Sequence, residues 1–261
     1  MADDVAAYAQ PTPRLLYVHD DLTGELGGRE AADPTAARLA RELLAAVATE
    51  PERVRVLTLD EQLDRVIAQG DHPPFAVAIG IDAAGRRVAQ ALHARTGWFP
   101  CVRSIGLTRE EDGRGGYRLA SPDGRGPAGQ LRDLTAVGPV AVVDDTVFSG
   151  LTMRAVIEAL PAPARARVHA FCLRGVAESI ATVAALCPIT AGVTAPGRRL
   201  EDVSFINASG LVRRIAIRRA GRAPLAFFDR PEWIRAWFPS SHSRVLALCR
   251  ELNARLEPPP S

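Results

Sequence analysis

The sequence predicts an α/β protein in which a mostly parallel central sheet is flanked by helices. Apolar strand-like runs alternate with helical patterns along most of the 261 residues. From residue 75 onward these runs are mostly apolar, and 75–81 is apolar throughout, which is typical of strands buried on both faces. Hydrophobic residues make up 47% of the chain and charged residues 24%, a balance that allows a sizeable core.

The first 70 residues follow a β-α-β-α pattern. The first strand ends in His19, Asp20 and Asp21, which favour either a metal site or, more commonly, a cap on the following turn. In the next helix, Asp33 is suited to cap the N-terminus and Pro34 to occupy the first helical position. The predicted strands and helices cover residues 14–21, 33–47, 53–59 and 61–70.

A second run of strands and helices begins at Phe75. Strands are predicted over 75–81, 99–107, 140–143, 167–173, 189–194 and 202–207, with helices over 87–96, 153–160 and 177–186. The segment Thr108–Gln130 interrupts this alternation, because it is rich in glycine, proline and charge. Connections of that length are usually functional lids or disordered segments, so we expect one of these here.

The end of the chain has a different composition. A hairpin is predicted around Ala220–Gly221, followed by an aromatic-rich segment and a final amphipathic helix over 243–256. Trp233 and Trp237 are four residues apart, a spacing that favours one helical face packed on the core. We therefore divide the chain at the sequence level into an N-terminal extension, a core and a C-terminal region, packed as one compact unit: residues 1–72, 73–210 and 211–261.

Charge and composition exclude several classes of protein. The formal net charge is +2, which gives no indication of binding to nucleic acid or to an anionic membrane. No apolar stretch approaches the roughly 20 residues of a membrane span. The N-terminus lacks the pattern of a secretory signal, so we expect a cytoplasmic protein with reduced thiols. The four cysteines have no metal-ligand spacing, and Cys101 and Cys172 lie in apolar runs that predict burial.

The most informative run is VAVVDDTVFSGLT, residues 140–152. It predicts a buried strand that leads into Asp144 and Asp145, then a turn at the start of a helix. Ligands of parallel sheets bind at the carboxyl ends of the strands, and a helix N-terminus attracts phosphate. Gly150 permits close approach of the backbone, while Ser149 and Thr152 add hydroxyl donors. The acids suit sugar hydroxyls and the Mg²⁺ that accompanies a polyphosphate.

This run resembles the signature of type I phosphoribosyltransferases, in which apolar residues, two acids, three variable positions, Ser or Thr, Gly, any residue and Thr follow one another. The resemblance covers roughly residues 75–207. It implies a parallel-sheet core with a flexible lid and a C-terminal hood. It also implies transfer of ribose 5-phosphate from phosphoribosyl pyrophosphate (PRPP) to a nitrogen of a purine, deazapurine, pyrimidine or related heterocycle. Mg²⁺ is the implied cofactor, small molecules are the partners, and a homodimer is the implied assembly.

The resemblance assigns roles to individual residues. Asp144, Asp145 and Arg103 would be catalytic, with Mg²⁺ reaching the two acids through PRPP. The loop for the 5-phosphate comprises Thr146, Val147, Phe148, Ser149, Gly150, Leu151 and Thr152. Pyrophosphate would meet Ala84, Gly85, Arg86 or Arg87, and Arg103. The lid would contribute Arg109 and Arg114, and the base would meet Phe148, Phe227 and Trp233.

Each weaker assignment has a plainer alternative. The turn at Gly85 is equally typical of close helix packing, and Arg103 of an exposed strand end. Arg109 and Arg114 fit a disordered segment without contacts, and Trp233 fits a core position.

One position departs from the family. Phe148 stands where the hypoxanthine-type enzymes carry an aspartate that handles the proton of the base. A phenyl ring accepts no proton, so the acceptor must arrive nucleophilic, or another residue must deprotonate it, or catalysis must rest on positioning and charge stabilisation. This departure keeps open a second reading, a regulator or sensor that binds PRPP without turnover.

Overall fold

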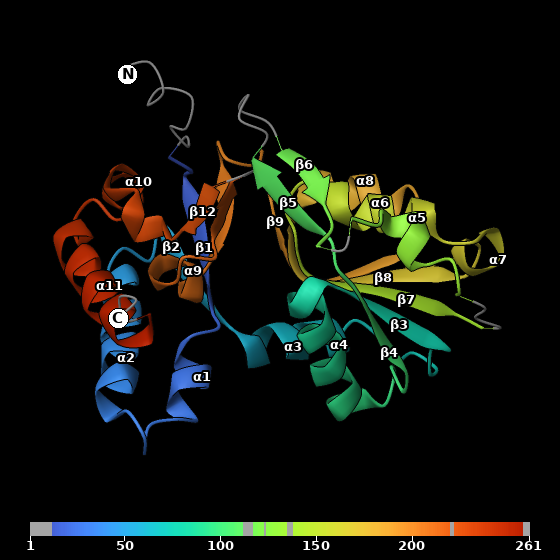
Figure 1. The fold of residues 1–261 in the computed structure, drawn as a ribbon, viewed down its shortest axis with the longest axis horizontal. Coiled ribbons are helices and arrows are strands. Elements are labelled where there is room, and N and C mark those ends of the chain that lie inside the picture. Colours follow the sequence, from blue (N-terminus) through green and yellow to red (C-terminus); the bar gives the residue numbers. More distant parts are fainter. Residues whose placement is uncertain (1–11, 112–116, 123, 135–137, 220–221, 258–261) are drawn as a thin grey trace. The chain divides into compact units, whose positions relative to one another are not determined.

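The computed structural model describes residues 12–111, 117–122, 124–134, 138–219 and 222–257 (Figure 1). The chain forms two compact units. The terminal unit comprises Met1–Leu59, Glu110–Tyr117 and Leu200–Ser261, and the central unit comprises Asp60–Arg109 and Arg118–Arg199. No helix within the described ranges is both long enough and apolar enough to cross a membrane.

These units differ from the sequence-based division at 72/73 and 210/211, and from the single unit expected there. The reason is a non-local strand pairing. Strand β1 (Leu15–Asp20) pairs in parallel with β2 (Val54–Thr58) on one side and with β10 (Val203–Asn207) on the other. The two ends of the chain therefore share one sheet, and the strand near residue 205 belongs to the terminal unit.

Helices pack on one face of the three-stranded sheet of the terminal unit. Asp33 caps the longest N-terminal helix as predicted, because its carboxylate accepts a hydrogen bond of 2.9 Å from the amide of Ala36. Trp233 and Trp237 lie in the core with Leu39 and Leu43. The helices are α1 (Thr23–Gly27), α2 (Pro34–Val47), α9 (Ala208–Val212), η2 (Phe227–Asp229), α10 (Pro231–Trp237) and α11 (His242–Leu256).

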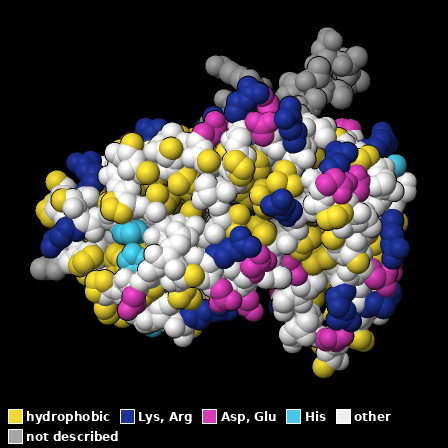
Figure 2. All heavy atoms as spheres, turned by 180° about the vertical axis from the view of Figure 1, so that it is seen from behind, with side chains coloured by type: hydrophobic (Ala, Val, Ile, Leu, Met, Phe, Trp, Pro, Cys, Tyr) yellow, Lys and Arg dark blue, Asp and Glu magenta, His cyan; other side chains and the backbone are white. Residues whose placement is uncertain are grey.

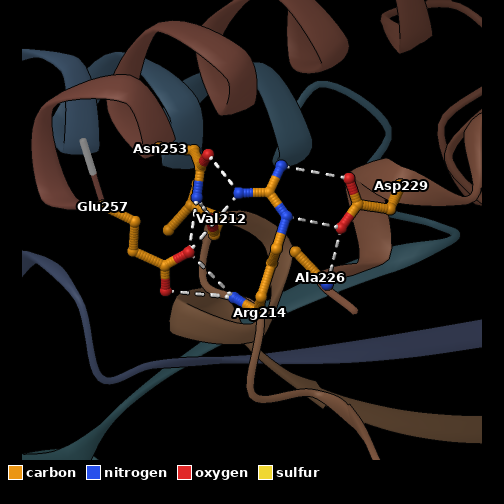
Figure 3. A network of polar contacts seen from close by, with 6 residues as sticks. All are labelled: Val212, Arg214, Ala226, Asp229, Asn253 and Glu257. Atoms are coloured by element: carbon orange, nitrogen blue, oxygen red, sulfur yellow. Dashed lines mark hydrogen bonds and ion pairs between the residues drawn. The ribbon is translucent and has the colours of Figure 1, made fainter. Parts of the chain in front are cut away.

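A polar network around Arg214 ties the C-terminal helix to this unit (Figure 3). The guanidinium of Arg214 donates to Asn253 on α11 at 2.9 Å and contacts both carboxylate oxygens of Asp229 in η2 at 3.2 and 3.3 Å. Asn253 donates in turn to the carbonyl of Val212 in α9 at 2.7 Å and to Glu257 at 3.0 Å. The short elements α9 and η2 are thereby held against α11. The predicted hairpin is present as the antiparallel strands β11 (Ile217–Arg219) and β12 (Arg222–Leu225), while its turn lies outside the described residues.

The central unit contains the predicted α/β fold, a five-stranded parallel sheet flanked by helices. The strand order is β4-β3-β7-β8-β9. Figure 1 shows α3 and α4 on one face of this sheet and α6 and α8 on the other. The strands are β3 (Val77–Ile81), β4 (Val102–Ile105), β7 (Val140–Val147), β8 (Val168–Val176) and β9 (Ile189–Ala195). The helices are α3 (Leu59–Ile67), α4 (Asp82–Thr96), α5 (Pro127–Gln130), α6 (Leu151–Ala159), α7 (Ala162–Arg165) and α8 (Ala177–Ala184).

Two apolar layers cover the faces of this sheet. Side chains alternate along each strand, so Val140 and Val142 belong to the layer under α6, and Ala141 and Val143 to the layer under α4. This double burial explains the unbroken apolar runs of the sequence. Cys172 is buried as predicted, but Cys101 is exposed. The prediction for Cys101 was wrong because this residue precedes β4, which is an edge strand.

A cluster of aromatic and histidine rings fills one end of the layer under α3 and α4. The His72 ring meets His169 edge-on at 4.8 Å between centroids, and His169 stacks on Phe171 at 4.6 Å. Nε2 of His169 lies 2.9 Å from Oγ1 of Thr190. Histidine side chains lie together among apolar ones on the face drawn in Figure 2. Burial, and to a smaller extent His72, lowers the pKa of His169 to about 4.

This shift predicts that the protein loses stability in mild acid. The unfolded chain binds a proton at His169 below about pH 6.5, whereas the folded chain does so only near pH 4. We therefore expect the free energy of unfolding to fall by about 1 to 2 kcal/mol between pH 6.5 and pH 4. This loss is smaller than that of a fully buried histidine, because the ring is only half-buried and solvent screens its charge. Urea unfolding at several pH values measures this. His169→Gln should flatten the dependence, whereas His93→Gln, at an exposed site, should not. An equal slope in both variants would contradict the prediction.

Candidate functional site

The predicted signature forms a strand, a short turn and a helix at the carboxyl edge of the central sheet. Strand β7 continues through Asp144 and Asp145 as far as Val147, four residues beyond its predicted end. Thr146 and Val147 therefore belong to the strand rather than to the turn. Phe148, Ser149 and Gly150 make the turn. Leu151 and Thr152 lie in the first turn of α6, whose leading amides have no partner within the helix.

Contacts with α8 fix the backbone of this turn. Ser179 donates a hydrogen bond of 2.7 Å to the carbonyl of Phe148, and Thr182 donates one of 2.8 Å to the carbonyl of Ser179. Gly150 adopts a left-handed conformation with φ of 72°, and a Cβ atom there would lie 2.9 Å from Oγ1 of Thr182. Glycine is thus required for two independent reasons, conformation and space. The turn is preformed with its backbone close to α8.

The start of α4 packs directly against the acid pair. A Cβ atom on Gly85 would lie 2.3 Å from the carbonyl oxygen of Val143 and 3.2 Å from Cα of Asp144. A Cβ atom on Gly80 would lie 2.5 Å from the backbone of Arg86. The turn at Gly85 is therefore closely packed against β7. Its consequence is that the N-terminus of α4 lies beside Asp144.

An acid occupies the first position of α4. Asp82 has a left-handed backbone with φ of 53°, and its carboxylate accepts a hydrogen bond of 2.8 Å from the amide of Ala83. Ala84 is half-buried, and Arg86 and Arg87 are exposed on the first turns of the helix. Left-handed backbone at a non-glycine residue is uncommon and often found at functional turns. The sequence analysis missed Asp82, because its conformation has no sequence signal.

Arg103 lies on the exposed edge strand β4, opposite Ile79 of β3. Side chains alternate along a strand, so Arg103 shares a face with Ile105, which packs in the layer under α6. Helix α4 covers the other face, and Ser104 contacts it by donating to the carbonyl of Asp82 at 3.4 Å. The side chain of Arg103 and helix α4 therefore lie on opposite faces of the sheet, and Arg103 is exposed.

The sequence analysis missed Arg174 of β8. This side chain is 1% exposed and its Nη2 lies 3.0 Å from Oδ2 of Asp145. Its Nη1 donates to Oε1 of Gln62 on α3 at 3.2 Å, and Gln62 is 0% exposed. The available signal was a charged residue within the apolar run 168–176. Asp145 is thus an ion-paired carboxylate rather than an isolated acid.

The acid pair offers two carboxylates at the carboxyl end of β7. In the described ranges, no three His, Cys, Asp or Glu side chains converge as metal ligands. Asp144 accepts the amide of Asp145 at 2.8 Å. Mg²⁺ commonly uses one or two carboxylates together with phosphates and water, and this pair can supply that number.

The acids at the end of β1 were predicted to form either a metal site or a cap on the following turn. Asp20 caps that turn, because its carboxylate accepts hydrogen bonds of 3.2 and 2.8 Å from the amides of Leu22 and Thr23.

The predicted lid segment contains short ordered elements. Strands β5 (Thr108–Glu111) and β6 (Tyr117–Ala120) precede α5. Oε1 of Gln130 accepts a hydrogen bond from the amide of Gly106, and Nε2 of Gln130 donates one to the carbonyl of Gly106, both at 2.9 Å. The last residue of the segment therefore contacts the backbone just before its first residue. The side chain of Arg109, and Arg114 as a whole, lie outside the described residues.

Of the predicted base contacts, Phe148 lies in the turn after β7, next to the acid pair. Phe227 and Trp233 lie in the terminal unit, where their rings are 6.2 Å apart. Trp233 is 4% exposed within the core cluster, as the packing alternative held.

No protein-family model matches this sequence. No curated protein matches it. Among solved structures, 56% of the chain is similar to 87% of a purine phosphoribosyltransferase from Pyrococcus horikoshii, at 19% identity and a TM-score of 0.36. An orotate phosphoribosyltransferase from Aeropyrum pernix matches over 52% of this chain and 69% of that one, at 17% identity and 0.31.

A hypothetical protein from Neisseria gonorrhoeae with bound ppGpp matches over 57% of this chain and 85% of that one, at 15% identity and a TM-score of 0.39. The chain spans only 54% of the AQ2163 protein from Aquifex aeolicus, which matches 46% of this chain at 15% identity and a TM-score of 0.32. These are distant similarities of fold.

Proposed function

We propose that the protein is a PRPP-dependent phosphoribosyltransferase that acts on a nitrogen heterocycle. The observation that carries this proposal is the contact of Gly85 with Val143 and Asp144. It puts the N-terminus of α4 beside the acid pair, while the chain runs from the same acids into the N-terminus of α6. Two helix N-termini next to two carboxylates suit a ligand with phosphate at both ends and a diol between them.

In this proposal the turn from Phe148 to Thr152 binds the 5-phosphate, and the acid pair offsets the positive charge that develops on the ribose ring. The bond from C1 to the pyrophosphate oxygen breaks and its electron pair leaves with pyrophosphate. A bond from C1 to the base nitrogen forms, and the proton that this nitrogen carried passes to water. Mg²⁺ bound to the pyrophosphate would stabilise the charge of the leaving group. Phe148 accepts no proton, so the nitrogen must attack without help from that position.

The test compares Asp144→Asn with wild type. Binding of Mg²⁺-PRPP is measured by titration calorimetry, and pyrophosphate release is then followed with a panel of purine, deazapurine and pyrimidine bases. We expect Asp144→Asn to reduce release by about 100-fold, the usual effect of removing one transition-state contact. Glu158→Gln, on the exposed side of α6, should match wild type. Release at the wild-type rate by Asp144→Asn would refute the proposal.

A second candidate, a PRPP-binding regulator without turnover, is favoured by Phe148 and by the acid at the start of α4. Asp82 contributes a negative charge at the end of the helix where pyrophosphate would bind. The same titration separates the two candidates. Binding of PRPP without release of pyrophosphate for any base in the panel would identify the regulator.

A further inference from the structure

Arg174 of the central unit carries a buried guanidinium, 1% exposed, that the proposed mechanism does not use. Taking a charge out of water costs several kcal/mol, and the cost is offset only when partners are close and well placed. Arg174 has two such partners, Asp145 at 3.0 Å and Gln62 at 3.2 Å. Hydrophobic residues occupy most neighbouring positions of β8, so burying an apolar side chain at this position would cost less free energy than burying an arginine.

The fold brings three elements together to build this contact. Arg174 of β8 is in register with Thr146 of β7, so its side chain lies next to the end of that strand. Helix α3 comes close to the sheet at Gly192 of β9, where a Cβ atom would lie 2.6 Å from the carbonyl of Gln62 and 2.7 Å from that of Leu173. Gln62, Arg174 and Asp145 thus form a chain of contacts from α3, through β8, to the acid pair.

The charge of Arg174 reduces the repulsion between the acid pair and an anionic ligand. Asp144 and Asp145 are adjacent, and a ligand with phosphate at both ends is itself strongly negative, so two uncompensated carboxylates would repel it. Arg174 offsets the charge of Asp145 and fixes the direction of its carboxylate. Within the same strand, the carboxylate of Asp144 accepts a hydrogen bond of 2.8 Å from the amide of Asp145.

We propose that Arg174 is a positioning residue for the PRPP site. It holds Asp145 and compensates its charge, and Gln62 orients the guanidinium from the other side. This inference rests on the proposed function. It assigns Arg174 a role through Asp145 and not by contact with the ligand.

The experiment measures thermal unfolding without ligand and the dissociation constant of Mg²⁺-PRPP for wild type, Arg174→Met, Arg174→Lys, Asp145→Asn and the double variant Arg174→Met/Asp145→Asn. Each of Arg174→Met and Asp145→Asn should lower the melting temperature by several degrees, because each leaves a buried or half-buried charge without its partner. The double variant should recover most of that loss. Arg167→Met, at an exposed position just before β8, is the control and should change neither quantity.

For PRPP, we expect at least tenfold weaker binding in Arg174→Met and in the double variant, and partial rescue in Arg174→Lys, which keeps the charge. A merely structural arginine would give folded Arg174→Met and Arg174→Lys variants that bind PRPP with wild-type affinity, and that result would overturn the inference. Arg174→Lys keeps the test decisive even if Arg174→Met does not fold. Absence of PRPP binding by wild type would reject the proposed function itself, whereas wild-type binding with equal affinity in folded Arg174 variants would reject only this inference.

Discussion

Replacing Gly85 with alanine is expected to destabilise the protein by about 2 to 4 kcal/mol and to abolish PRPP binding. The new Cβ atom would lie 2.3 Å from the carbonyl oxygen of Val143 and 3.2 Å from Cα of Asp144. Both obstacles are backbone atoms of a central strand, so no flexible side chain can turn away. Alanine normally favours a helix over glycine by about 1 kcal/mol, a gain too small to compensate. Helix α4 must therefore move away from the sheet and from the acid pair.

Denaturant unfolding and calorimetric titration with Mg²⁺-PRPP measure the two effects. The matched control is Gly129→Ala in helix α5, where the Cβ atom would meet only the side chain of Arg125, at an ordinary distance of 3.5 Å. That variant should be neutral or stabilised by up to about 1 kcal/mol. Equal stability of Gly85→Ala and Gly129→Ala would mean that α4 does not pack on β7 in this way, and the main support for the proposed function would be lost.

The sequence predicts the strand-turn-helix signature well because the relevant constraints are local. Apolar residues before Asp144, a glycine with two hydroxyl residues, and a helical pattern after them all lie within the 21 residues 140–160. The strand nevertheless continues to Val147, because pairing with β8 goes on through Thr146 and Val147. No pattern in β7 alone contains that information. Ladder hydrogen bonds to a neighbouring strand override the tendency of two acids to end a strand.

Features that depend on distant segments were not predictable in the same way. Arg174 lies 29 residues from Asp145 and 112 from Gln62, so their contact depends on strand register and on the close approach of α3 at Gly192. Strand β10 lies beside β1 although nearly 190 residues separate them. Periodicity identifies each strand but not its neighbour, and this is why the predicted boundary at residue 210 differs from that of the terminal unit.

Replacing Gly150 with alanine should destabilise the protein by about 2 to 3 kcal/mol and weaken PRPP binding at least tenfold. Two costs add here. A left-handed backbone costs a non-glycine residue about 1 to 2 kcal/mol, and the Cβ atom would lie 2.9 Å from Oγ1 of Thr182. Thr182 cannot readily turn, because it donates to the carbonyl of Ser179, which itself bonds to the turn at Phe148.

The double variant Gly150→Ala/Thr182→Ala separates these costs, with Thr182→Ala as its reference. Removing Oγ1 relieves the clash, so relative to Thr182→Ala the second substitution should cost only the backbone part, about 1 to 2 kcal/mol. Phosphate binding should recover only in part, since it depends on backbone amides whose direction is set by the left-handed residue before α6. Full recovery of PRPP affinity in the double variant would show that only space matters at Gly150. Undiminished affinity in Gly150→Ala alone would show that the ligand does not bind at this turn, because no phosphate can approach amides that the new side chain has displaced.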